Sequence, residues 1–174
     1  MNPNALVNSG IRFVVLAIVQ AFLFKQITLG FGGGDVLFVF VYPIFILLLP
    51  LRMPRPMVIF TSFCLGLTID LFYETLGMHA AAATFAAYVR AAILQFIQPQ
   101  EKYNIKAHPT PNDLGWPWFI RYTGLLLFFH LLFFFSVQAF TPVYWWSIVI
   151  KTIFSFLASY LLVLLLILVF NPKT

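Results

Sequence analysis

Six runs of apolar residues occupy most of this 174-residue sequence, and short polar, glycine-rich or proline-rich segments separate them. A helix needs about 20 apolar residues to cross the hydrocarbon core of a bilayer. The sequence therefore predicts an all-α, polytopic integral membrane protein, a bundle of six transmembrane helices forming a single transmembrane domain over residues 1–174. The expected spans are residues 11–29, 36–51, 57–73, 78–97, 119–140 and 144–170.

The low content of charged residues excludes an ordinary soluble enzyme. Only 9% of the residues are charged, whereas a soluble domain carries about 25%. The net charge of +5 comes from basic residues scattered at the ends of the apolar runs, which is how membrane proteins place orientation signals. We therefore expect the lipid bilayer as a partner and no nucleic acid.

The distribution of lysine and arginine predicts the orientation in the membrane, because these residues accumulate on the cytoplasmic side. With six spans, Lys25 and Lys151 fall on one side, and Arg90 lies within a span. The other side carries Arg12, Arg52, Arg55, Lys102, Lys106, Arg121 and Lys173. This bias predicts that both termini are cytoplasmic (N-in/C-in).

Three interruptions of the apolar pattern are expected to be irregular. Residues 30–34 are glycine-rich and predict a loop, since such backbone does not lie exposed in lipid. The run 36–51 is short and contains Pro43, which predicts a kinked or tilted span. Residues 98–118 contain four prolines, and they are expected to form a proline-rich cytoplasmic loop.

The hairpin between the third and fourth spans contains the most informative polar residues. Ser62, Gly66, Asp70 and Glu74 recur every four residues, so they are expected to share one helix face, and small residues at that spacing allow close helix packing. The fourth span is rich in alanine and is the expected packing partner of this face. An ionisable residue such as Asp70 normally faces protein or water inside a membrane.

We expect Asp70 to meet His79, or the backbone N–H groups at the start of the fourth span, whose dipole favours a carboxylate. A pair with Arg90 is disfavoured, because the two residues differ in depth by about 12 Å at 1.5 Å per residue. Arg90 is instead expected to extend toward the cytoplasmic face or to meet a partner. A structural clasp is favoured over a proton or substrate site at Asp70, Glu74 and His79, since only one hairpin is polar.

No arrangement of residues predicts catalysis. The sequence has no Ser-His-Asp, HExxH or CxxC pattern, so we expect no catalytic residue, no metal ligand and no cofactor. His130 lies alone in an apolar run and is expected to be a buried histidine that is hydrogen-bonded to a neighbour.

The segment Gly66 to Ala80 reads GLTIDLFYETLGMHA, which resembles the signature hairpin of the bacterial rod shape-determining protein MreD family. The flanking segments 46–50 and 81–84 are most similar to members from Bacteroidetes-type bacteria. Glu74 and the long loop 98–118 depart from the family pattern. The matching positions are Gly66, Leu67, Asp70, Leu76, Gly77, His79 and Ala80.

The resemblance implies a non-catalytic scaffold of the cell-elongation complex in the bacterial inner membrane. Its expected partners are an MreC-like single-span protein, a class B transpeptidase, a RodA-like glycosyltransferase and the MreB filament, for peptidoglycan synthesis and control of cell shape. Gly66, Asp70, Gly77 and His79 would form the partner-binding hairpin, with Ser62 and Arg90 secondary. The alternative is a six-helix substrate-binding subunit of a vitamin-type transporter, which the family resembles. A third hypothesis, an intramembrane lipid-modifying enzyme, needs paired polar residues at one depth that the sequence does not offer.

Overall fold

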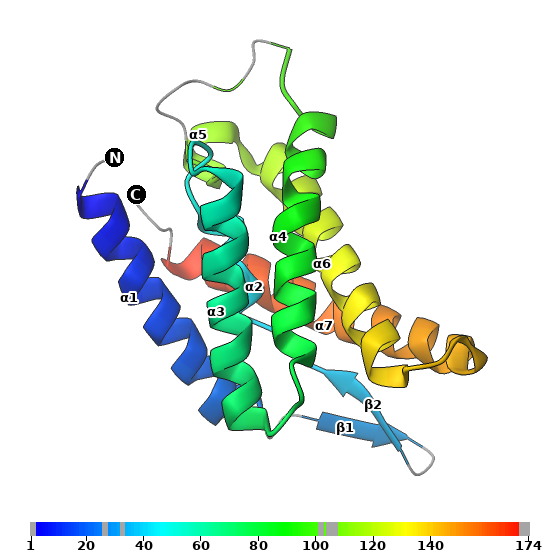
Figure 1. Cartoon of the computed structure of the whole chain (residues 1–174). Coiled ribbons are helices and arrows are strands. Elements are labelled where there is room, and N and C mark those ends of the chain that lie inside the picture. The colour runs from blue at the N-terminus through cyan, green and yellow to red at the C-terminus, as the bar shows by residue number, and fades with distance from the viewer. Residues whose placement is uncertain (1–2, 26–27, 32–33, 101–102, 104–107, 171–174) are drawn as a thin grey trace.

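The computed structural model describes residues 3–25, 28–31, 34–100, 103 and 108–170, and helices form nearly all of its regular structure (Figure 1). Helix α1 continues directly into the π-helical turn η1, and the 3₁₀ turn η2 precedes α7. The elements are α1 (Pro3–Val19), η1 (Gln20–Phe24), α2 (Pro43–Leu48), α3 (Arg55–Tyr73), α4 (Met78–Phe96), α5 (Pro111–Leu114), α6 (Trp116–Ala139), η2 (Pro142–Tyr144) and α7 (Trp145–Phe170).

Three helices in the described part of the chain are long and apolar enough to cross a membrane, over residues 55–73, 116–139 and 142–170. A fourth apolar helix, over residues 9–24, is shorter. Helix α4 has the same length as α3, 19 residues, but it consists largely of alanine. The helical architecture predicted from the sequence is therefore confirmed, and the three long apolar helices indicate a membrane protein.

The second predicted span is not a helix. Residues 28–38 form an antiparallel hairpin of β1 (Thr28–Phe31) and β2 (Gly34–Phe38), residues 39–42 are mostly extended, and only the six residues of α2 are helical. The glycine-rich segment predicted as a plain loop thus contributes to two strands. Val36 to Tyr42 are almost all β-branched or aromatic residues, which favour strands. Pro43 then begins a helix, where its missing N–H is harmless.

We call residues 39–49 the core segment, because every one of them is buried. Helix α2 contacts α1, α3, α4 and α6, so it lies at the centre of the bundle. Non-helical backbone is tolerated at membrane depth only where protein covers it. The surrounding helices supply that cover.

The core segment runs along most of α4. Near one end the ring of Phe40 lies 6.0 Å from that of His79, and at the other end Arg90 donates to the carbonyl of Leu49. His79 and Arg90 are separated by about 16 Å along α4 at 1.5 Å per residue. The segment therefore connects the end of the bundle at the β-hairpin to the end where α3 begins (Figure 1).

The predicted loop 98–118 is partly helical. Helix α5 occupies Pro111–Leu114, and α6 begins at Trp116 rather than at residue 119. Pro117 lies in the first turn of α6, where proline is favoured. Lys102 and Lys106 of this loop, and Lys173 of the C-terminal tail, lie outside the described residues.

Candidate functional site

Helices α3 and α4 approach each other most closely at Gly66. A Cβ atom at this position would lie 2.5 Å from both the Cα of Ala80 and the carbonyl oxygen of His79. Atoms do not pack at that distance, so only glycine allows the two backbones to touch here. Ser62 lies one turn away on the same face and is fully buried, and its hydroxyl donates to the carbonyl of Val58. The predicted packing of this face against the fourth span is confirmed.

The carboxylate of Asp70 caps the start of α4. Its Oδ1 accepts the backbone N–H of His79 at 3.0 Å, and its Oδ2 accepts that of Ala80 at 2.8 Å. The first N–H groups of a helix have no partner within the helix, and Gly77 at the N-cap position has no side chain to satisfy them. Asp70 supplies this cap from the neighbouring helix, where the positive end of the α4 dipole favours its charge.

The imidazole of His79 completes this clasp. Its Nδ1 lies 3.0 Å from Oδ1 of Asp70 and 3.1 Å from Oγ1 of Thr75, and the Thr75 hydroxyl donates to the same carboxylate oxygen. A carboxylate only accepts hydrogen bonds, so Nδ1 carries the proton. Both contacts predicted for Asp70 are therefore present, and the side chains of Asp70 and His79 are almost fully buried.

The turn between α3 and α4 depends on two residues with positive φ. Glu74 ends α3 with φ of 56°, and Gly77 precedes α4 with φ of 81°. A Cβ atom on Gly77 would meet nothing within 4 Å. Gly77 is therefore required for its backbone conformation, whereas Gly66 is required because the backbone of α4 leaves no room for a side chain. Glu74 is exposed and forms the left-handed end of α3, so the prediction that it shares the helix face of Ser62, Gly66 and Asp70 is wrong.

Arg90 lies in the protein interior, and its hydrogen-bond partners belong to the same chain, at the end of the bundle where α3 begins. It is 4% exposed, its Nε donates to the hydroxyl of Tyr122 at 2.7 Å, and its Nη2 donates to the carbonyl of Leu49. The Tyr122 hydroxyl in turn donates to the carbonyl of Leu47. The broken second span explains this placement, since the carbonyls at the end of α2 need donors that a continuous helix would have supplied.

Gln20, one of the few polar residues of the first apolar run, forms hydrogen bonds with the backbone of the core segment before α2. Its Nε2 donates to the carbonyl of Val39 at 3.0 Å, and its Oε1 accepts the N–H of Val41 at 2.7 Å and that of Tyr42 at 3.3 Å. One amide thus replaces three hydrogen bonds that a regular element would make. The π-helical turn η1 begins at this residue, consistent with the association of such turns with functional positions.

Two serines of α7 bind the other edge of the same segment. The N–H of Phe38 donates to Oγ of Ser155 at 3.0 Å, and that of Phe40 donates to Oγ of Ser159 at 2.9 Å. Both serines are fully buried. Their spacing of four residues within an apolar run was the available sequence signal, because it places both on one helix face.

His130 is hydrogen-bonded in the core, as the sequence predicts. Its Nδ1 lies 3.2 Å from the carbonyl of Ala82, and its Nε2 lies 2.8 Å from the hydroxyl of Tyr42. A carbonyl only accepts, so Nδ1–H donates to Ala82 and Nε2 accepts from Tyr42 in the neutral ring. This pair connects the core segment to α4 and α6.

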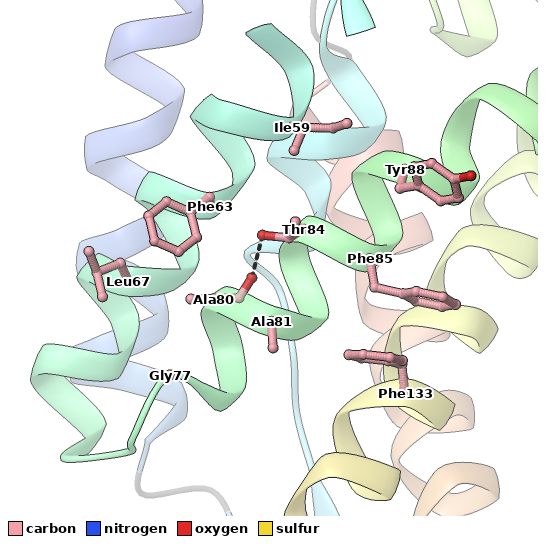
Figure 2. A pocket seen from close by; sticks show the side chains of 10 residues that line it. All are labelled: Ile59, Phe63, Leu67, Gly77, Ala80, Ala81, Thr84, Phe85, Tyr88 and Phe133. Atoms are coloured by element: carbon pink, nitrogen blue, oxygen red, sulfur yellow. Dashed lines mark hydrogen bonds between the residues drawn. The ribbon is translucent and has the colours of Figure 1, made fainter. Parts of the chain in front are cut away.

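An apolar groove of about 680 Å³ lies on the outer side of the α3–α4 hairpin (Figure 2). Ala80, Ala81 and Thr84 of α4, together with Gly77 at its N-cap position, are the small residues of its lining. The remaining lining residues are Ile59, Phe63 and Leu67 of α3, Phe85 and Tyr88 of α4, and Phe133 of α6, with the Phe85 and Phe133 rings stacked at 4.2 Å.

The groove has almost no hydrogen-bonding capacity. The hydroxyl of Thr84 donates to the carbonyl of Ala80 at 2.7 Å within α4, as Figure 2 shows. The hydroxyl of Tyr88, which is 69% exposed, is the other polar side-chain group that lines it. No charged side chain contributes to the lining. Its occupant must therefore be apolar.

Within the described part of the chain, no three histidine, cysteine, aspartate or glutamate residues are grouped to hold a metal ion. Comparison with known protein families, with curated proteins and with solved structures finds no match for this sequence. The arrangement that remains is a rigid polar clasp behind an apolar groove, in a protein with three described helices that are long and apolar enough to cross a membrane.

Proposed function

We propose that this protein is a non-catalytic scaffold of the MreD type in the bacterial inner membrane, and that it binds the transmembrane helix of a partner. The groove on the α3–α4 hairpin carries this proposal. In the proposed topology the chain crosses the membrane six times, with both termini cytoplasmic and with the core segment as the second crossing. The length of α4 that the core segment follows supports that crossing.

A single apolar helix fits the groove better than lipid chains do. Gly77 with Ala81, and Ala80 with Thr84, form two pairs of small residues four apart on α4. Such pairs let a second helix approach the backbone closely, and helix association in membranes depends on this packing. From Ile59 to Leu67 the groove follows α3 for about 12 Å, or roughly two helical turns. A single-span protein of the MreC type is the partner that we propose.

The clasp gives the groove its shape. Gly66 and Asp70 fix the position of Ala80, and Ala80 forms part of the groove. Displacement of α4 relative to α3 would therefore change the width of the groove. In the proposed elongation complex, this rigid surface would hold the partner helix in register with a transpeptidase, a RodA-like glycosyltransferase and the MreB filament.

A photo-crosslinking experiment in native membranes tests the proposal. Replacement of Tyr88 by p-benzoylphenylalanine places the photoreactive group in the groove with a similar ring, and Leu161 of α7, which is 66% exposed, is the matched control. We expect an MreC-like protein to be crosslinked from position 88 and not from position 161. Crosslinking to lipid alone from position 88 would refute a helix-binding groove.

Affinity purification in mild detergent separates the scaffold from the alternative function. Co-purification of an MreC-like protein and a transpeptidase supports the scaffold, whereas an ATPase pair with a coupling membrane subunit identifies a transporter's binding subunit. Ala81→Trp should reduce recovery of the partner at least tenfold by filling the groove. Leu161→Trp on the exposed face of α7 should leave recovery unchanged.

A further inference from the structure

A second hollow lies between the end of α6 and the start of α7, at the end of the bundle that carries the β-hairpin (Figure 1). Its volume of about 290 Å³ is close to the lower bound of about 300 Å³ for small-molecule sites. In contrast to the groove on α3 and α4, it is lined by several polar side chains, and we call it the polar hollow. These side chains are Gln138 of α6, Tyr144 of η2, and Ser147 and Lys151 of α7.

Lys151 supplies the charge of the polar hollow. It is the only charged residue among the 26 residues of α7, and it is half-buried. Its Nζ lies 5.7 Å from the centroid of the Phe38 ring, and no carboxylate pairs with it in the part of the chain that the structure describes. A charged residue in a membrane-spanning helix is costly and normally has a partner. An aromatic ring does not neutralise the ammonium group, so this group is available to bind an anion.

The other three polar side chains of the hollow can donate hydrogen bonds to the same anion. Tyr144 and Ser147 each carry a hydroxyl group, and Gln138 carries an amide N–H₂ group. None of the three forms a side-chain hydrogen bond with another described residue. Ser147 precedes Lys151 by four residues, so both lie on one face of α7. One positive charge with several neutral donors suits a ligand group that carries one negative charge.

The position of the hollow along α7 indicates that the anion belongs to a lipid. Trp145 and Trp146 are the first two residues of α7, and they are 60% and 61% exposed. Exposed tryptophans at the end of a membrane-spanning helix are typical of the level of the lipid headgroups. Lys151 lies only about 9 Å further along the helix at 1.5 Å per residue. A lipid phosphate at the headgroup level is therefore within reach of the Lys151 side chain.

We propose that the polar hollow binds the phosphate group of an anionic phospholipid. The phosphodiester carries one negative charge, which the ammonium group of Lys151 compensates, and it accepts hydrogen bonds from the three neutral donors. The acyl chains lie along α7, where Phe154 and Leu161 follow Ser147 at spacings of 7 and 14 residues on nearly the same face and are 50% and 66% exposed. This inference goes beyond the scaffold function, because it involves neither the groove nor a partner helix.

The chemistry of the hollow also favours one kind of headgroup. Among the described residues, no acidic side chain lines the hollow. An ethanolamine or choline headgroup would therefore bring a second positive charge close to Lys151 without a carboxylate to compensate it. A glycerol headgroup adds no charge and offers hydroxyl groups to Gln138 and Tyr144. We therefore expect a preference for phosphatidylglycerol over the zwitterionic phospholipids.

Native mass spectrometry of the purified full-length protein tests this inference. The protein in detergent micelles would be titrated with phosphatidylglycerol, phosphatidylethanolamine and phosphatidylcholine that have the same acyl chains. We expect phosphatidylglycerol to bind about tenfold or more tightly than the other two, and equal binding of all three would overturn the proposal. Inorganic phosphate should not displace phosphatidylglycerol, because it lacks the acyl chains that contact α7. Displacement by inorganic phosphate would show a site for the free anion and would refute a lipid site.

Substitutions at Lys151 separate a specific site from general attraction by the net charge. Lys151→Met should weaken binding of phosphatidylglycerol about tenfold or more, since a charge-assisted hydrogen bond is lost, and Lys151→Arg should retain most of the affinity. Lys25→Met is the matched control, because it removes a positive charge at the same end of the bundle from a residue that does not line the hollow. Equal losses in the two methionine variants would refute the site.

A second variant fills the hollow without changing the charge. Ser147→Leu places a larger apolar side chain where the phosphate group is expected, so it should weaken phosphatidylglycerol binding to a similar degree. Ser147 is exposed, so this change should not prevent folding, and unchanged binding would contradict the proposal. Ala81→Trp in the groove should leave lipid binding unchanged, so failure of the scaffold proposal and failure of this one are distinguishable.

Discussion

Substitution of Gly66 by alanine provides the most direct test of how the two helices are held together. The new Cβ atom would lie 2.5 Å from Cα of Ala80 and from the carbonyl oxygen of His79, and 2.7 Å from the Ala80 nitrogen. All three are backbone atoms, so no side-chain rotation relieves the contact. An ordinary contact distance requires α4 to move away by roughly 1 Å.

That displacement removes the cap on α4. The carboxylate of Asp70 lies 3.0 Å from the N–H nitrogen of His79 and 2.8 Å from that of Ala80. A shift of about 1 Å takes both distances to nearly 4 Å, beyond hydrogen-bonding range. Hydrogen bonds to a charged group contribute about 1.5–3 kcal/mol each. We therefore expect Gly66→Ala to lower the free energy of unfolding by about 3–5 kcal/mol.

The assay is unfolding of the purified protein by sodium dodecyl sulfate in mixed micelles, followed by circular dichroism. Gly124→Ala in α6 is the control, because its Cβ would meet the Tyr160 ring no closer than 3.6 Å. The two variants make the same chemical change in helices of the same bundle. If Gly66→Ala and Gly124→Ala differed in stability by less than about 1 kcal/mol, the argument from close helix approach would be wrong.

Three other substitutions, together with one control, test the buried polar groups. Gln20→Met leaves three backbone groups of the core segment unpaired, at about 1–3 kcal/mol each, so the same unfolding assay should show a loss of at least about 3 kcal/mol. Gln138→Met, which removes an amide without a hydrogen bond among the described residues, should change stability little. Asp70→Ala should lower the folded fraction in size-exclusion chromatography, and normal assembly with loss of the proposed function would instead indicate a proton or ligand role. Thr123→Val removes a buried hydroxyl that has no partner among the described residues; equal or higher stability is expected, by up to about 1 kcal/mol, and a clear loss would show that the hydroxyl is satisfied.

The α3–α4 hairpin could be predicted from the sequence because its contacts are local. Asp70 and His79 are nine residues apart, on either side of one tight turn, so each has few other partners. Small residues four apart also indicated which faces of the two helices would meet. The directions of these side chains follow from helix periodicity alone.

The core segment could not be predicted in the same way. Hydropathy reports that residues 36–51 avoid water, and it is equally high for a helix in lipid and for an extended chain covered by protein. What distinguishes the two is the set of partners for the backbone, and these are distant in sequence. Ser155 is 117 residues from Phe38, and Arg90 is 41 residues from Leu49. The partners of Arg90 could not be predicted for the same reason.

The dependence of the core segment on α7 has a consequence for biogenesis. Membrane proteins are synthesised from the N-terminus, so Phe38 and Phe40 emerge long before Ser155 and Ser159, the groups that accept their N–H bonds. Unpaired backbone groups cost several kcal/mol each in hydrocarbon. The core segment therefore cannot reach its final, hydrogen-bonded position before the last helix is in place. Chains arrested before α7 should exchange these amide hydrogens rapidly, while the complete chain protects them. Folding of this protein is thus not a sequence of independent steps, since the core segment is completed only after α7, the last helix, has been made.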